Sequence, residues 1–390
     1  MAEQKKIELY IHIPFCQQKC AYCDFLSAPA DADVRRRYAE ALIEEINIKS
    51  QAFENYSVPT IFIGGGTPSM LAGVHIAQIM EAVYASFSVE KTAEITIECN
   101  PGTLDKEKAL HYKHAGINRI SLGLQSVHDR ELQLLGRIHT YEQFLTSYDL
   151  VRKAGFENVN VDLMSGLPGQ TFADWQSSLK KVVSLQPEHI SAYGLIIEEG
   201  TPFYERFGAD ERRREEGVTP LFLPTEEAER EMYGWTEEYL SRHGYHHYEI
   251  SNYARPGREC IHNIGYWRRE NYLGLGLGSA SLVENERFSN TSDLDIYLRG
   301  EAWRQKTIRE HIILDRKAQM EEFMFLGLRM MKGVSRAEFK NCFGVELEGV
   351  YGTVIAELCK KGLVKQQEGY LSLTKEGLSV SNYVMSEFLG

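Results

Sequence analysis

Two hydrophobic periods alternate along the first half of the chain, and this alternation constrains the fold more than any other feature. Apolar runs with a strand-like period predict strands at residues 7–13, 58–63, 94–98, 118–122, 158–162 and 189–193. Between the first two, apolar residues recur every four positions from Val34 to Ile46 behind Asp31 or Asp33, which predicts a capped helix. Two predicted helices end on Gly116 and Gly155, each directly before a strand. Strands and helices that alternate in this way predict βαβ units and a parallel sheet.

Polar residues at the strand ends favour one of two parallel-sheet architectures. Six βαβ-type units fit both a doubly wound sheet and a (β/α) barrel. Glu98, Gln125 and Asp162 stand at the ends of successive strands, where (β/α) barrels carry their active sites. We therefore predict an α/β fold with a partial, TIM-like (β/α)6 barrel.

The length and composition indicate more than one folded unit. The chain has 390 residues, of which 43% are hydrophobic and 25% charged, as in ordinary globular proteins of two or three domains. We expect the barrel over residues 1–200, an extension over 201–310, and a C-terminal winged-helix-like α+β domain over 311–390. The last domain is predicted from helices near residues 323 and 335, followed by a hairpin over 362–373.

Two segments of the extension lack a clear pattern. Residues 203–224 are charged and irregular, and within them residues 212–216 (RRREE) are expected to form a solvated loop or helix face. Gly274, Gly276 and Gly278 lack the following helix of a dinucleotide site, so they indicate close packing of the backbone.

Three cysteines crowd into eight residues directly after the first predicted strand. Cys16, Cys20 and Cys23 form a C-x3-C-x2-C cluster of soft ligands. Three thiolates on one loop can hold three corners of an iron–sulfur cube and leave its fourth iron open to a small chelating molecule. The alternatives are plain core cysteines or a zinc site, which would need a fourth ligand. The other cysteines are lone residues: Cys99, Cys260, Cys342 and Cys359.

The residues around this cluster resemble a known family. The cysteine spacing is similar to the cluster loop of radical S-adenosylmethionine (SAM) enzymes. Residues 10–16 (YIHIPFC) and 23–25 (CDF) resemble the branch around anaerobic coproporphyrinogen III oxidase, and within it most of all the haem chaperones of HemW type. The resemblance covers nearly the whole chain. It implies a radical-SAM partial barrel, a [4Fe–4S] cluster, bound SAM and, for the chaperones, haem.

The resemblance also implies which residues contact SAM. The glycines of the run 64–66 let backbone approach a ligand, although such a run alone fits a bare turn equally well. Carboxylate, amide and guanidinium groups at strand ends suit the hydroxyl, amino and carboxylate groups of SAM, while the alternative is that they cap neighbouring helices. The contacts expected from the family are Tyr10, Tyr22, Gly65, Gly66, Thr67, Glu98, Gln125, Arg137 and Asp162.

A second motif is similar to the signature that separates the haem chaperones from the oxidases. Residues 262–267 read HNIGYW, which fits the pattern H-N-x-x-Y-W. Imidazole is a common axial ligand of haem iron, and Tyr266 and Trp267 offer apolar surface to a porphyrin. The resemblance thus implies His262 as a haem ligand. The alternatives are His246 or His247 as the ligand, or His262 as a hydrogen-bonded core residue.

Two features depart from the oxidase. The oxidase has a further cysteine two residues past the third, where this chain has Phe25. It also has a long arm ahead of its first strand, whereas here the first predicted strand starts within ten residues of Met1. A haem chaperone is therefore the first hypothesis, and oxygen-independent coproporphyrinogen III oxidase, a radical SAM decarboxylase, is the second. Cleavage of SAM stays open, and no catalytic residue is assigned.

The charge and the lack of targeting segments bound the partners. Forty-three basic and fifty-five acidic residues give a net charge of −12, which argues against nucleic acid as a partner. Glu8 interrupts the apolar run of a signal peptide, so we expect a cytoplasmic chain. The resemblance implies haem and an unidentified haem-accepting protein as partners, with peripheral contact where that acceptor is membrane-bound. If SAM is cleaved, it also implies a reductant such as flavodoxin or ferredoxin.

Overall fold

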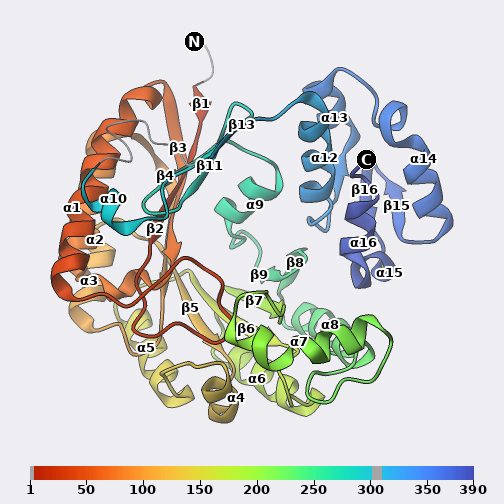
Figure 1. The fold of residues 1–390 in the computed structure, drawn as a ribbon, viewed down its shortest axis with the longest axis horizontal. Coiled ribbons are helices and arrows are strands. Elements are labelled where there is room, and N and C mark those ends of the chain that lie inside the picture. The colour runs from red at the N-terminus through yellow and green to blue at the C-terminus, as the bar shows by residue number, and fades with distance from the viewer. Residues whose placement is uncertain (1–3, 301–309) are drawn as a thin grey trace.

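The computed structural model describes residues 4–300 and 310–390, and most of its strands form one continuous sheet (Figure 1). Six strands lie side by side in chain order and run parallel. They are β2 (Glu8–Ile13), β3 (Tyr56–Gly65), β4 (Ser88–Cys99), β5 (Arg119–Gln125), β6 (Val159–Ser165) and β7 (His189–Gly194). The predicted partial (β/α)6 barrel is confirmed.

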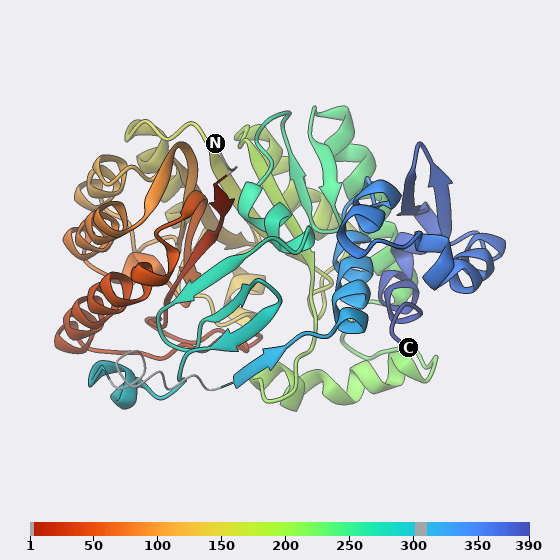
Figure 2. The ribbon, with the colours of Figure 1, turned by 90° about the horizontal axis from the view of Figure 1, so that it is seen from above.

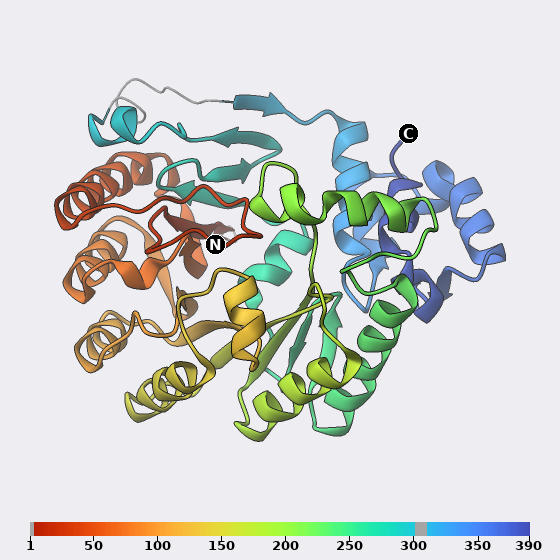
Figure 3. The same ribbon diagram turned by 60° about the horizontal axis from the view of Figure 1, so that its bottom comes forward.

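Helices along the outer face of these strands connect them (Figure 3). They are α1 (Ala32–Lys49), α2 (Gly73–Ser86), α3 (Lys106–His114), α4 (Asp129–Leu134), α5 (Tyr141–Lys153) and α6 (Phe172–Ser184), with short 3-10 turns η1 (Ser50–Phe53) and η2 (Pro68–Met70). The N-cap of α1 is Asp31, whose side chain accepts a hydrogen bond from the Val34 amide at 2.9 Å. The joints at Gly116 and Gly155 have φ values of 84° and 85°, the left-handed conformation predicted for them.

Strands from the second half of the chain extend both edges of the parallel sheet. Beside β2 lie β10 (Tyr272–Leu275), parallel to it, and then the antiparallel strands β11 (Ala280–Val283), β12 (Glu286–Ser289) and β13 (Glu310–Ile313). Beside β7 lie the antiparallel strands β9 (Asn252–Ala254) and β8 (His246–Glu249). The short β1 (Lys5–Lys6) pairs with β3. Over the described residues the sheet is therefore open and does not close into a barrel.

One segment predicted to be irregular is a helix. Residues 203–224 include most of α7 (Pro202–Glu215), which Thr201 caps by accepting a hydrogen bond from the Tyr204 amide. The irregular pattern hides this helix because Phe203 and Phe207 are buried against the cluster loop and β6, although charged residues surround them in the sequence. Arg212 and Glu215 are exposed on α7, as the helix-face alternative predicted. Further helices are α8 (Glu226–Arg242), α9 (Ile261–Trp267) and α10 (Leu294–Leu298). Among the described residues, no helix is both long and apolar enough to cross a membrane.

The C-terminal part of the chain packs to one side of the large sheet (Figure 2). It consists of α12 (Arg316–Gly327), β14 (Val334–Ser335), α13 (Arg336–Phe343), α14 (Leu347–Lys360), β15 (Val364–Gln367), β16 (Tyr370–Leu373), α15 (Lys375–Ser379) and α16 (Ser381–Ser386). The helices α12, α13 and α14 precede the hairpin of β15 and β16, and this part has a separate apolar core around Phe339 and Leu358, which gives the expected winged-helix-like layout. Residues 301–309, which the predicted extension includes, lie outside the described residues, and the three-domain division stays a prediction.

The two faces of the parallel sheet differ in polarity. Successive strand residues point to opposite faces, and the outer one is apolar, as for Leu9 and Ile11 against α1. The inner face carries polar side chains that are nevertheless buried, and hydrogen bonds join neighbouring strands across it. Asn160 on β6, for example, lies 2.6 Å from the ring of His189 and donates to Ser121 at 2.8 Å. The carboxyl ends of the parallel strands lie together at one edge of this inner face.

A buried carboxylate fixes the later strands to the first helix. Glu45 on α1 is fully buried and accepts hydrogen bonds from the Gly276 amide at 2.8 Å, the Asn290 side chain at 2.6 Å and the Tyr297 hydroxyl at 2.6 Å. Gly276 has a φ of 100°, and a Cβ there would lie 2.5 Å from the carbonyl oxygen of His12. The predicted close packing of this glycine segment is confirmed.

Candidate functional site

The predicted site residues gather around one cavity at the carboxyl ends of the parallel strands. The cavity has a volume of about 370 Å³. All the predicted metal and SAM residues except Tyr10 line it, and His262 does not. The predicted residues in its lining are Cys16, Cys20, Tyr22, Cys23, Gly65, Gly66, Thr67, Glu98, Gln125, Arg137 and Asp162.

The cluster loop lies between β2 and α1 and is held by backbone hydrogen bonds. The Cys16 amide donates to Ala28 at 3.2 Å, and the Cys23 amide donates to Cys20 at 3.2 Å. All three cysteines are free thiols that are partly exposed. Burial raises the pKa of the Cys23 thiol to about 11, and the neighbouring thiols of Cys20 and Cys16 add to this rise. Iron would replace the protons, since the thiolate is the ligand form.

The geometry of the three thiols bears on which metal group they fit. Over residues 4–300 and 310–390, no three His, Cys, Asp or Glu side chains lie close enough to hold a single metal ion. A [4Fe–4S] cube differs from a single ion because each thiolate binds its own iron. Three soft donors on one loop beside a cavity therefore fit a cube with one open iron.

The glycine run ends β3 and packs tightly against β2. Gly65 has a φ of 109°, and a Cβ there would overlap the ring of His12. The Gly66 amide donates to the Ile13 carbonyl at 2.9 Å, and a Cβ on Gly66 would lie 2.9 Å from the carbonyl oxygen of Phe15. Glycine is therefore required at these two positions for packing, which the sequence did not reveal. The absence of a side chain lets the end of β3 approach β2, the strand that carries the cluster loop.

Two half-buried carboxylates, Glu98 and Asp162, lie in the cavity wall. Burial, with a further contribution from Asp162, raises the pKa of Glu98 to about 8, although the Gly65 amide donates to Glu98 at 3.1 Å. Burial also raises the pKa of Asp162, which accepts hydrogen bonds from Ser121 at 3.1 Å and Asn160 at 2.7 Å. Among the described residues, no Lys or Arg forms an ion pair with either carboxylate. This pair suits a ligand that brings positive charge and hydroxyl groups, as SAM does.

Gln125 completes this wall in an unusual conformation. It ends β5 with a φ of 70°, at an irregularity in the pairing of β5 with β6. The left-handed region is uncommon for a residue with a Cβ, and such strained residues tend to cluster at active sites. The bulge turns the Gln125 side chain toward the cavity, where it is 9% exposed.

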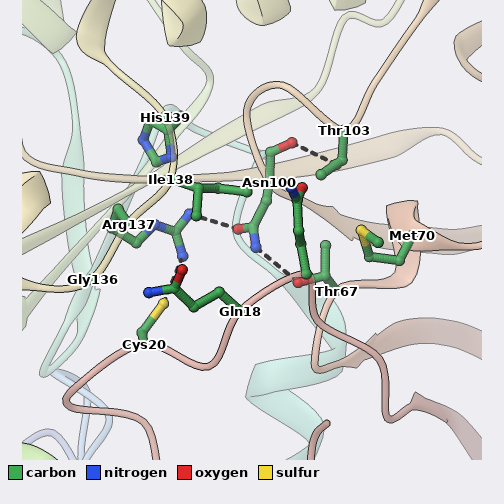
Figure 4. Close-up of a pocket in the computed structure, with 11 residues that line it drawn as sticks. Gln18, Cys20, Thr67, Met70, Asn100, Thr103, Gly136, Arg137, Ile138 and His139 are labelled. Atoms are coloured by element: carbon green, nitrogen blue, oxygen red, sulfur yellow. Dashed lines mark hydrogen bonds between the residues drawn. The ribbon is translucent and has the colours of Figure 1, made fainter. Parts of the chain in front are cut away.

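Arg137 forms part of a hydrogen-bonded chain beside the cluster loop (Figure 4). Its Nη2 donates to Asn100 Oδ1 and to the Gly123 carbonyl, both at 2.6 Å, and its Nη1 donates to Cys20 Sγ at 3.6 Å. The other end of the Asn100 amide donates to Thr67 Oγ1 at 2.8 Å. The guanidinium is therefore already held by the protein and faces both the cluster loop and the cavity.

Comparisons with known proteins agree with this geometry. Residues 10–182 match the Radical SAM superfamily, and residues 314–380 match the HemN C-terminal domain. The chain is 38% identical over 386 residues to "Heme chaperone HemW" of Lactococcus lactis subsp. lactis, covering 99% of this chain and 98% of that protein. The chain belongs to the HemW family of radical SAM proteins. Its identity to proteins of the same name is 37% for Bacillus subtilis, with 98% of each chain covered, and 32% for Escherichia coli, with 100% of each covered.

A solved structure shares the fold of this HemW-family chain. It is described as "Coproporphyrinogen III oxidase (HemN) from Escherichia coli is a Radical SAM enzyme" and matches with a TM-score of 0.83. The match covers 99% of this chain and 90% of that one, at 23% sequence identity. At this identity the likeness shows the fold alone. The second hypothesis, that the chain is an oxidase, is therefore supported only by the shared fold.

Two predicted residues lie outside the cavity lining. Tyr10 is on the inner face of β2, where its hydroxyl lies 3.0 Å from His12 Nδ1. His262, in the H-N-x-x-Y-W motif on α9, is 1% exposed. Its Nδ1 is 2.8 Å from Thr60 Oγ1 and its Nε2 is 3.2 Å from the Tyr266 hydroxyl. Both ring nitrogens thus have partners within the protein.

Other residues in the lining of the HemW-family cavity were not expected from the sequence. Asn100 and Tyr193 are among them, and Phe25 also lines the cavity and is 63% exposed. The sequence carries a sign of Asn100, because it follows Glu98 by two residues just after β4. Tyr193 had a similar one, at the end of β7.

Proposed function

We propose that the chain is a haem chaperone that holds a [4Fe–4S] cluster and SAM and transfers haem to an acceptor protein. The observation that carries this proposal is its likeness, over nearly the full length, to relatives named heme chaperones, at 38% identity for the first of them. The cavity supports the cofactor part, because it brings the three cysteines beside Glu98 and Asp162.

We assign the roles by chemistry. Cys16, Cys20 and Cys23 would hold three irons of the cluster and leave its fourth iron without a protein ligand. A [4Fe–4S] cluster with SAM bound supplies one-electron chemistry. The protein's own residues bind and orient SAM: the carboxylates of Glu98 and Asp162 balance its positive charge and accept from its hydroxyl and amino groups. Gln125, Gly65, Gly66, Thr67, Tyr10, Tyr22 and Arg137 stay proposed SAM contacts.

We place haem outside this cavity, because the proposed cluster and SAM would fill it. The proposed ligand His262 must exchange its hydrogen bonds to Thr60 and Tyr266 before either ring nitrogen can bind iron. Burial, with a smaller effect from Arg119, lowers the pKa of His262 to about 3, so its imidazole is neutral, as iron ligation requires. His246, on β8, is exposed and is the main rival.

The partners follow from the same proposal. Haem is the cargo, and an unidentified protein is the acceptor, with peripheral contact where that protein is membrane-bound. A flavodoxin or ferredoxin is the reductant if SAM is cleaved. A role in nucleic-acid binding is not proposed, and the cytoplasmic location stays a prediction from the sequence.

An anaerobic haem titration of reconstituted protein tests the function. Wild-type protein should bind haem with a Soret band, and His262→Ala should change the band and weaken binding. His246→Ala and His247→Ala are matched controls and should keep the wild-type spectrum. A wild-type spectrum in His262→Ala, with a changed one in either control, would reassign the ligand.

A parallel activity assay separates the two hypotheses. Coproporphyrinogen III is added with SAM and a reductant, and decarboxylated products are measured. We expect no turnover above a Cys20→Ala control. Turnover together with failure to bind haem would replace the chaperone by the oxidase, despite Phe25.

A further inference from the structure

A continuous series of hydrogen-bonded side chains connects Cys16 to Cys20 through the cavity wall, and Figure 4 shows the part of it that involves Thr67, Asn100, Arg137 and Cys20. Cys16 Sγ lies 3.4 Å from Thr67 Oγ1, and Thr67 Oγ1 accepts from Asn100 Nδ2 at 2.8 Å. Asn100 Oδ1 accepts from Arg137 Nη2 at 2.6 Å, and Arg137 Nη1 donates to Cys20 Sγ at 3.6 Å. Asn100 is the central member and touches neither sulfur.

The donors and acceptors fix a direction along this chain. A guanidinium only donates, so the Asn100 oxygen must face Arg137 and its NH₂ group must face Thr67. Thr67 then accepts from Asn100, which leaves its own hydrogen for Cys16. A cysteine that binds iron is a thiolate and only accepts. Both ends of the chain therefore present a hydrogen-bond donor to a cluster sulfur.

Asn100 is held so that it can set this direction. The backbone N–H of Asn100 donates to Ser69 Oγ at 3.2 Å, and its backbone carbonyl accepts from the Thr103 hydroxyl at 2.7 Å. These two hydrogen bonds fix the backbone of Asn100 at the end of β4. Opposite it, a Cβ on Gly123 would lie 3.1 Å from Asn100 Oδ1 and 3.2 Å from Arg137 Nη2. The glycine leaves room for the amide and guanidinium to meet.

We propose that Asn100 is a positioning residue that raises the reduction potential of the cluster, by holding Arg137 against Cys20 and Thr67 against Cys16. The proposal rests on the proposed [4Fe–4S] cluster. Reduction adds one electron to the cluster, taken from a low-potential one-electron donor. No covalent bond among Cys16, Thr67, Asn100, Arg137 and Cys20 forms or breaks. The added negative charge strengthens hydrogen bonds to the sulfurs, so donors stabilise the reduced cluster more than the oxidised one.

A redox titration of the reconstituted full chain, without SAM, tests the proposal. Dithionite is the reductant, and the EPR signal of the reduced cluster gives the midpoint potential. In Asn100→Ala, the ratio of reduced to oxidised cluster at the wild-type midpoint should fall about tenfold, which for one electron is a shift of ~59 mV to more negative potential. Asn100→Asp has the same shape but cannot donate to Thr67 and adds negative charge, so its shift should be at least as large.

Two further variants separate positioning from a general disturbance of the loop. Thr67→Val keeps the side-chain shape but loses the hydroxyl, and should shift the potential in the same direction by a smaller amount. Met70 lines the same small pocket as Thr67, Asn100, Arg137 and Cys20 but makes none of these hydrogen bonds, so Met70→Leu should keep the wild-type potential. Iron and sulfide contents are measured for each variant.

Each outcome has a distinct meaning. A wild-type midpoint in Asn100→Ala or Asn100→Asp with full iron and sulfide overturns the proposal. Loss of the cluster from both Asn100 variants and from Thr67→Val also overturns it, because Asn100 would then be needed for assembly rather than for the potential. Wild-type protein that takes up no iron and sulfide would instead refute the proposed cluster itself.

Discussion

Glu8 is a buried acid on β2 that should make the chain less stable as the pH rises. Its side chain lies on the inner face of the sheet, 4% exposed, with Oε2 3.7 Å from Nδ1 of His262. Burial lowers the pKa of His262 to about 3, so this imidazole is neutral near pH 7 and offers Glu8 no ion pair. Burial, with the nearby carboxylates of Glu270 and Glu94, raises the pKa of Glu8 to about 9.

The size of the effect follows from the two pKa values. The ordinary pKa is 4.5, so between pH 4.5 and about 9 the folded chain keeps a proton that the unfolded chain releases. The stability that this proton contributes is complete below pH 4.5 and is lost as the pH rises toward 9. At about 1.36 kcal/mol per pH unit, the loss from pH 5 to pH 8 is about 4 kcal/mol. For cooperative unfolding of a chain of this length, it lowers the Tm by ~5 °C.

Thermal unfolding of Glu8→Gln across this pH range tests the reasoning. The neutral amide has no proton to lose, so the Tm of the variant minus that of wild type should rise by about 5 °C between pH 5 and pH 8. Glu54→Gln, at an exposed position, is the control and should show a constant difference. A constant difference for Glu8→Gln would mean that Glu8 is ionised in the folded chain and would refute the argument.

The cavity leads to three more expected outcomes. After anaerobic reconstitution, Cys20→Ala should hold far less than one [4Fe–4S] per chain, while Cys99→Ala should keep wild-type iron and sulfide; equal contents would contradict the ligand assignment. Gly66→Ala forces a Cβ against the backbone of Phe15, so equilibrium dialysis should show SAM affinity reduced by about tenfold (~1.4 kcal/mol) with the cluster retained, and unchanged affinity would count against the site. Because the pKa of Glu98 is about 8, its carboxylate forms between pH 7 and 9, so wild-type SAM affinity should rise relative to Glu98→Gln over this range; parallel profiles would exclude Glu98 as the charge that SAM meets.

Much of the fold was readable because local patterns and long-range pairing agree. The βαβ alternation predicted the six parallel strands, and the strand-end residues Glu98, Gln125 and Asp162 predicted where the cavity lies. The carboxyl ends of parallel strands meet at one edge, so residues that are distant in sequence come together without any further information. The resemblance of the cysteine loop added the family, which the comparisons confirmed.

Other features could not be read because they depend on pairing across space. The pattern of β5 and β6 shows polar residues at alternate positions, which is also typical of a strand with one face in water, yet Ser121 and Asn160 are buried. The partners of Asn100 come from β3's end and from the segment after α4, and no local period links them. His262 shows the same limit, since its motif gives no sign that Thr60 and Tyr266 occupy both ring nitrogens.

The pairing of β10 with β2 has a consequence for the order of events during synthesis. β2 carries the cluster loop and is among the first elements made, but one of its two neighbours, β10, begins at Tyr272. At about 5–20 residues per second, the roughly 260 residues between them take on the order of 13–50 s to synthesise. Throughout that time β2 has a free edge that invites pairing with other chains. That edge is covered only once β10 has been made and the Gly276 amide just after it can donate to Glu45 on α1.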